Sequence, residues 1–165
     1  MSKKYNIGMY GGKFLPFHKG HLHCLEIAAH ECETVYLIMF YGGNEEEAAV
    51  AKFSGDADFL SVKNRIDKVI EVASDFKNVI PIFIDVSKCR LPDGSEDWDA
   101  ETPLVLSAMP CPNAVYGSEP KYADYFAKAY PGCYYRIVDP ARSDIPISAT
   151  EIRNMSVEER KVWLV

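Results

Sequence analysis

The chain has 165 residues, of which 48% are hydrophobic and 25% are charged, proportions typical of one soluble globular domain with a proper core. Its formal net charge of −6 argues against nucleic acid as the main partner, because duplex-binding proteins usually carry a basic face. No apolar run approaches the ~20 residues of a membrane helix, and the basic N-terminus leads into a strand pattern rather than the apolar core of a signal peptide. We therefore expect a single cytoplasmic domain over residues 1–165 without membrane or nucleic-acid partners, and homo-oligomerisation stays open.

Short apolar runs alternate with amphipathic helical patterns along the whole chain. The predicted strands, in chain order, cover residues 5–9, 34–40, 79–86, 113–117 and 133–138. The predicted helices cover residues 20–31, 61–76, 104–109 and 119–130, followed by a short helix that begins at Ser148 and a last one over 157–164. This alternation predicts an α/β fold, a Rossmann-like doubly wound parallel sheet of about five strands with flanking helices.

Two polar segments separate these elements. Residues 42–60 open with two glycines and the run Glu45 to Glu47, and we predict a mobile loop with a solvated acidic segment. Residues 88–102 are predicted to form a long loop that carries Trp98. Lys63 and Arg65, at the start of the next helix, are expected on the solvated surface. The segments that follow strands should meet at one rim, where open α/β sheets bind ligands.

The first motif is the run Gly-Gly-Lys-Phe-Leu-Pro-Phe-His-Lys-Gly-His over residues 11–21, between the first strand and the first helix. His18 and His21 are three residues apart and share a face at the helix N-terminus, where a phosphate also meets the helix dipole and free backbone N–H groups. Gly20 lets a ligand approach the backbone closely. The chain has no Gly-x-Gly-x-x-Gly sequence and no Walker spacing, so neither a dehydrogenase-type site nor a P-loop kinase is supported.

Two other interpretations of these histidines remain open. A zinc site would use His18, His21, His23 and Cys24, although no matching ligand cluster occurs elsewhere in the sequence. The other interpretation is that the two histidines form a purely structural pair. The five cysteines are scattered and form no Cys-x-x-Cys pair, so we expect buried reduced thiols.

The second motif is Ile147-Ser-Ala-Thr-Glu-Ile-Arg153. Ser148 or Thr150 can cap the helix that begins here, and Arg153 follows within one turn. A capped helix N-terminus beside an arginine fork is again typical of a phosphate site. Alone, this pattern is more often just a cap, and its value comes from being the second such site in the chain.

Together, the two motifs resemble the signature of the nucleotidylyltransferase superfamily with the (His/Thr)-x-Gly-His motif. The first motif is most similar to that of the nicotinamide-nucleotide adenylyltransferases of the archaeal and bacterial NAD-regulator type. The runs Tyr116-Gly-Ser-Glu119 and Asp139-Pro-Ala-Arg142, and Trp98, also resemble that branch. The resemblance implies a single nucleotidylyltransferase domain that transfers AMP from ATP to nicotinamide mononucleotide, with Mg²⁺ as the cofactor and small nucleotides as partners. We expect no kinase or repressor role, because the chain ends soon after the second motif.

The resemblance also implies roles for individual residues. His18, His21, Lys13 and Arg153 would be catalytic, with His21 nearest the charge of the transition state. Trp98 would stack on the nicotinamide ring of the acceptor. ATP would be bound by Gly11, Gly12, Phe14, Gly20, Ser118, Glu119, Arg142, Ser148 and Thr150. The alternatives are a phosphopantetheine adenylyltransferase, a cytidylyltransferase or a non-catalytic nucleotide sensor.

Overall fold

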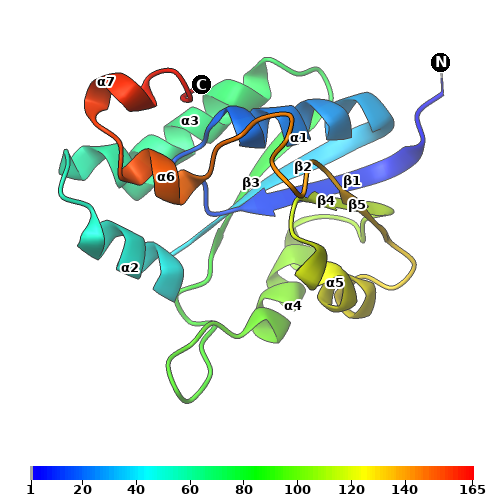
Figure 1. The fold of residues 1–165 in the computed structure, drawn as a ribbon. Helices are drawn as coiled ribbons and strands as arrows, with labels where there is room; N and C mark the ends of the chain where they lie inside the picture. The colour runs from blue at the N-terminus through cyan, green and yellow to red at the C-terminus, as the bar shows by residue number, and fades with distance from the viewer. Residues whose placement is uncertain (1) are drawn as a thin grey trace.

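Five parallel strands form one sheet in the order β3-β2-β1-β4-β5 (Figure 1). The computed structural model describes residues 2–165. The strands are β1 (Tyr5–Gly12), β2 (Cys32–Tyr41), β3 (Val79–Asp85), β4 (Ala114–Gly117) and β5 (Tyr134–Ile137). The order reverses at β1, which pairs in parallel with both β2 and β4. The predicted Rossmann-like doubly wound sheet is therefore confirmed, and its switch point lies at the carboxyl end of β1.

Helices cover both faces of this sheet (Figure 1). They are α1 (Lys19–Glu31), α2 (Asn44–Lys52), α3 (Val62–Ser74), α4 (Trp98–Ala108), α5 (Ala123–Ala129), α6 (Ala149–Arg153) and α7 (Val157–Arg160), with 3₁₀ turns η1 (Ala57–Leu60) and η2 (Pro120–Tyr122). Successive residues of β2 explain the two layers. Leu37 packs with Leu25 of α1 and Val69 of α3, whereas Ile38 packs with Val105 of α4 on the opposite face. Because side chains alternate along a strand, a strand buried on both faces is apolar throughout. No helix within residues 2–165 is long and apolar enough to cross a membrane.

The predicted mobile loop over residues 42–60 is wrong, because α2 and η1 occupy it. Gly42 turns the chain with a φ of 84°, and the three glutamates stand in the first turn of α2, where they complement the helix dipole. The predicted solvated acidic run is also wrong for Glu46. Its carboxylate is buried, accepts the Gly42 N–H and pairs with Arg65.

Arg65 is a further correction, because its side chain is buried and not solvated. Besides pairing with Glu46, its guanidinium donates to the Leu60 carbonyl at 3.0 Å and to the Lys13 carbonyl at 2.8 Å. Arg65 thus joins α2, η1 and the turn after β1. Lys63 remains exposed and pairs with Asp67 on its own helix.

The predicted loop over residues 88–102 is too long, because α4 begins at Trp98. The Asp97 carboxylate accepts the Ala100 N–H and caps this helix, which continues through Pro103, a residue that normally ends one. Trp98 and the residues after it therefore have fixed positions on a helix.

The C-terminal segment returns to the start of α1. The Lys19 N–H donates to the Trp163 carbonyl at 2.9 Å, and His18 forms an isolated antiparallel bridge with Leu164. The last residues of the structure therefore pack against the first motif.

Candidate active site

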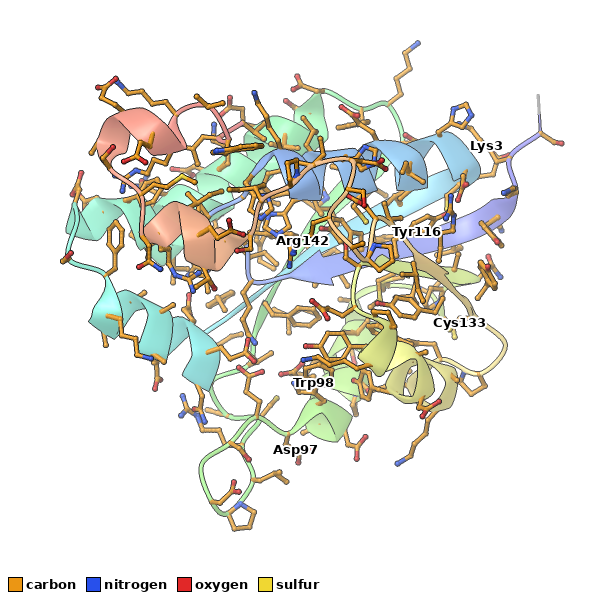
Figure 2. All side chains as sticks on the ribbon, in the orientation of Figure 1. Lys3, Asp97, Trp98, Tyr116, Cys133 and Arg142 are labelled. Atoms are coloured by element: carbon orange, nitrogen blue, oxygen red, sulfur yellow. The ribbon has the colours of Figure 1, made fainter. Side chains whose placement is uncertain are left out.

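A cavity of about 440 Å³ lies at the carboxyl ends of β1 and β4. Almost every site residue predicted from the sequence lines this cavity. The lining includes Gly11, Gly12, Lys13, Phe14, His18, Gly20, His21, Trp98, Ser118, Glu119, Arg142, Thr150 and Arg153. Figure 2 shows Arg142 and Trp98 on opposite sides of the end of β1. The structure thus brings both motifs to one site.

Ser148 is the exception, since it is absent from the cavity lining. Its hydroxyl accepts the Glu151 N–H at 3.2 Å and donates to the Glu151 carboxylate at 2.9 Å. The side chain is therefore engaged as the cap of α6, which is the plainer of the two roles that its sequence context suggests.

His18 and His21 form a reciprocal cap at the start of α1. The Gly20 N–H donates to His18 Nδ1 at 3.0 Å, and the His18 N–H donates to His21 Nδ1 at 3.1 Å. The two rings stack with centroids 3.7 Å apart. Since both Nδ1 atoms accept hydrogen bonds, the neutral tautomers carry their protons on Nε2. The pair therefore presents two N–H donors through its Nε2 atoms.

Both imidazoles are neutral at pH 7. Burial, followed by the charge of Arg142, lowers the pKa of His18 to about 4. Burial, followed by the neighbouring His18 and Arg142, lowers the pKa of His21 well below its usual value. A bound phosphate would reverse this trend, because nearby negative charge favours the imidazolium form.

Phe14 supports the His21 ring from another side. It is buried, adopts a φ of 52°, and makes an edge contact with His21 at a centroid distance of 4.9 Å. A bulky residue with positive φ is strained, and such strain persists only where packing enforces it. Phe14 thus shapes the turn through packing as well as through its backbone.

The structure gives the zinc interpretation of the histidines no support. Within residues 2–165, no group of three or more His, Cys, Asp or Glu side chains is arranged to hold a metal ion. Cys24 is buried, and burial raises the pKa of its thiol to about 12.

The His18 ring leaves no room for a side chain at position 20. A Cβ at this position would lie 2.8 Å from His18 Cε1 and 3.0 Å from Nδ1. Gly20→Ala is therefore expected to displace the ring and to lower kcat in the reaction proposed below by about 10-fold, since sub-ångström misplacement of a catalytic group is costly. Steady-state kinetics checks this, with Lys19→Ala, an exposed neighbour in the same turn, as the control. Equal kcat values for both variants would contradict it.

Three cationic side chains surround the same space. Lys13 Nζ lies 2.9 Å from Glu45 Oε2 and 3.1 Å from Glu96 Oε2. Arg153 donates to the Leu15 carbonyl at 2.8 Å and to the Thr150 hydroxyl at 3.2 Å.

Arg142 has a φ of 53° and donates to the Ile147 carbonyl at 2.8 Å. The hydrogen bonds of Arg142 and Arg153 orient each guanidinium group with only some of its donors. Other donors remain for a ligand, since an arginine side chain carries five N–H groups.

The other end of the cavity is aromatic and acidic. The Trp98 ring lies 4.7 Å from that of Tyr122 and 5.1 Å from that of Tyr125, and its indole N–H donates to Glu96 at 3.3 Å. Glu101 also lines this end, and its pKa is raised to about 7, first by burial and then by the charge of Glu96.

The sequence reasoning missed Glu96 and Glu101. Placing a helix at Trp98 would have found Glu101, because residues three apart share a helix face.

The model of the cytidylyltransferase-like family matches residues 9–155, which include both motifs. The chain belongs to the cytidylyltransferase-like family. The family match and the two motifs place the chain in the nucleotidylyltransferase superfamily, as the sequence resemblance predicts.

Two curated relatives of this family member carry the name trifunctional NAD biosynthesis/regulator protein NadR. The protein of Salmonella typhimurium strain LT2 is 25% identical over 154 residues, 90% of this chain and 36% of the relative. The protein of Escherichia coli K12 is 25% identical over 157 residues, 92% of this chain and 37% of the relative. The chain thus spans little more than a third of the length of these relatives.

Solved structures give the same picture of the fold of this cytidylyltransferase-like protein. A NadR protein in complex with NAD and AMP-PNP is 26% identical with a TM-score of 0.66, over 98% of this chain and 46% of that one. A bifunctional NMN adenylyltransferase/ADP ribose pyrophosphatase from Francisella tularensis is 20% identical with a TM-score of 0.60, over 91% of this chain and 41% of that one. The second likeness concerns the fold alone.

Proposed function

We propose that the protein transfers AMP from ATP to nicotinamide mononucleotide, giving NAD and pyrophosphate. The observation that carries this proposal is the stacked His18–His21 pair, whose Nε2–H donors belong to the same cavity as Arg153 and the Trp98 side chain. One end of the cavity thus suits a triphosphate and the other a flat ring. The NadR complex with NAD and AMP-PNP supports the choice of nucleotides, since that protein binds both.

The chemistry needs no protein nucleophile. A phosphate oxygen of the acceptor forms a bond to the α-phosphorus of ATP, and the bond from that phosphorus to the bridging oxygen of pyrophosphate breaks. Catalysis then consists of positioning and of neutralising charge on the phosphates. In this proposal, His21 stabilises the charge on the α-phosphate, while His18, Lys13 and Arg153 hold the triphosphate.

The glycine-rich turn admits the phosphates to the backbone. Gly11 and Gly12 close β1, and a Cβ at either position would lie 2.8 Å from an aromatic ring, that of Phe40 or that of Phe14. Ser118 and Glu119 follow β4 and line the cavity, where we assign the adenosine. Arg142 and Thr150 complete the proposed phosphate contacts.

Mg²⁺ belongs to the proposal as an ion that enters with ATP. It supplies charge neutralisation for the phosphates when bound. Phosphate oxygens and water suit its octahedral demands better than a dedicated protein cage. A cytoplasmic location is likewise part of the proposal, in keeping with the five free cysteines.

One assay tests the proposed function. The protein is incubated with Mg²⁺, either ATP or CTP, and either nicotinamide mononucleotide or phosphopantetheine, and pyrophosphate release is measured. Release with ATP and nicotinamide mononucleotide alone is expected. Release only with CTP or only with phosphopantetheine would overturn the choice of substrates, and nucleotide binding without turnover would identify a sensor.

Trp98 is expected to contact the acceptor and not ATP. Trp98→Ala should raise KM for nicotinamide mononucleotide about 10-fold, because stacking on an indole contributes roughly 1–2 kcal/mol. KM for ATP should change less than about twofold. Tyr134→Ala, which removes an exposed aromatic side chain that does not line the cavity, is the control. An unchanged KM for the acceptor would remove Trp98 from its binding site.

A further inference from the structure

Glu96 and Glu101 leave two buried carboxylate oxygens without a hydrogen-bond partner. The Glu96 side chain is 8% exposed and Glu101 is 9% exposed. In the part of the chain that the structure describes, Oε1 of each carboxylate has no partner. Both residues line the cavity beside Trp98. A buried polar atom without a partner costs roughly 1–3 kcal/mol, and a donor on a ligand in this cavity would relieve that cost for Glu101. Oε1 of Glu96 faces Gly43 instead, so Glu96 contributes its negative charge to this end of the cavity.

Lys13 does not neutralise this acidic pair. Its ammonium group is shared between Glu45 and Glu96, and no ion pair reaches Glu101 within the described residues. With all three side chains of Lys13, Glu96 and Glu101 ionised, one negative charge is in surplus. Burial, followed by the charge of Glu96, raises the pKa of Glu101 to about 7. This end of the cavity therefore favours a cation.

Aromatic rings enclose the same end. Trp98 packs against Tyr122 and Tyr125, and the Tyr125 hydroxyl, which donates to the Trp98 carbonyl at 2.8 Å, helps to fix the arrangement. The faces of aromatic rings attract cations, and the attraction grows when water is excluded. Buried carboxylates and a tryptophan thus act together on a flat, positively charged group.

We propose that Glu96 and Glu101 select an acceptor whose base is positively charged and bears hydrogen-bond donors, and reject one whose base carries a carboxylate. This inference rests on the proposed function, because it interprets the aromatic end of the cavity as the acceptor site. Nicotinamide mononucleotide has a pyridinium ring with an uncharged carboxamide, which offers two N–H donors. In nicotinic acid mononucleotide, a carboxylate replaces that carboxamide and meets the acidic pair with like charge. Glu96 and Glu101 are then specificity-determining residues.

A binding experiment tests the role of charge without any turnover. The probes are 1-methylnicotinamide, a pyridinium cation methylated on the ring nitrogen, and nicotinamide, its uncharged counterpart. Their binding is followed by quenching of Trp98 fluorescence in a Trp163→Phe background, which leaves Trp98 as the single tryptophan. The cation is expected to bind about 10-fold more tightly, and Glu101→Gln is expected to remove most of that difference. Equal binding of the two probes would overturn the inference.

A turnover experiment tests the selection between acceptors. The ratio of kcat/KM for nicotinamide mononucleotide to that for nicotinic acid mononucleotide is expected to exceed ~100 in the wild type and to fall at least ~10-fold in Glu96→Gln and Glu101→Gln. Glu47→Gln, an exposed glutamate that pairs with Arg90 outside the cavity, should leave the ratio unchanged. A ratio near one in the wild type, or one that both variants retain, would overturn the inference.

The two experiments separate this inference from the proposed function. Preference for the cation without pyrophosphate release from ATP and nicotinamide mononucleotide would overturn the function and support the acidic pair. Turnover of both acceptors at equal kcat/KM would leave the function standing and overturn the pair. Thermal unfolding at pH 8 guards against misfolding. Glu101→Gln should unfold at the same or a higher temperature, because ionising a group whose folded pKa lies above its unfolded value destabilises the protein.

Discussion

His21→Ala is expected to lower kcat about 100- to 1,000-fold, the usual effect of removing one donor that stabilises developing charge. The Kd for ATP should change less than about threefold, because Lys13, His18 and Arg153 remain. The reason lies in the ring pair: His18 fixes the tautomer of His21 through its backbone N–H, so that the Nε2–H is preorganised as a donor. Single-turnover kinetics and nucleotide titration measure the two quantities separately.

His30→Ala is the matched control for this experiment, because His30 lies exposed in the last turn of the same helix. Its kcat should equal that of the wild type. His21→Ala also leaves the His18 N–H without its acceptor, and thermal unfolding shows how much stability is lost. Equal and small effects of His21→Ala on kcat and on ATP affinity would mean that His21 is structural.

Arg153→Ala is expected to reduce kcat/KM for ATP about 100-fold, because a charged hydrogen bond to phosphate in a partly buried site is worth roughly 2–3 kcal/mol. Arg153→Lys should recover only part of this loss, since an ammonium group cannot bond Leu15, Thr150 and a phosphate in the same fork geometry. Steady-state kinetics at varied ATP concentration checks both variants.

Arg90→Ala separates the loss of a ligand contact from the loss of a structural bond. Arg90 also donates to backbone carbonyls, those of Ser87 and Gly42, but it does not line the cavity. Its removal should lower stability by about 1 kcal/mol, as should removal of the Arg153 bond to Leu15, and leave kcat/KM for ATP unchanged. A similar loss of kcat/KM in both variants would mean that Arg153 acts through stability alone.

The order of the elements and the meeting of both motifs at one cavity could be predicted from the sequence, because the signals that mark them are local. The β2 sequence is apolar on both faces, which is typical of a central strand in a two-layered core. His18, Gly20 and His21 lie within four residues of one another, so their common location needs no knowledge of the fold. The role of Ser148 as a cap could likewise be predicted from the neighbouring residues, because serine is a preferred residue directly before a helix.

The buried ion pair and the acidic end of the cavity could not be predicted in this way. Glu46 and Arg65 are charged residues on different helices, and each one alone is typical of a solvated surface. Only the fold brings them together as a buried ion pair. Glu96 and Glu101 could not be assigned to the cavity because the start of α4 at Trp98 was not predicted. That start depends on the Asp97 cap, and the helix continues through Pro103.

The return of the C-terminal segment to the first motif has a consequence for the timing of folding. Arg153 bonds the carbonyl of Leu15, which lies 138 residues earlier, and Trp163 bonds the backbone at Lys19. Contacts between residues so far apart in sequence form late, because closing a long loop costs entropy. A growing chain on the ribosome therefore exposes the histidine motif long before the arginine that completes the site is synthesised. We expect ATP-binding competence to arise only after Arg153 has been synthesised, and not gradually along the chain.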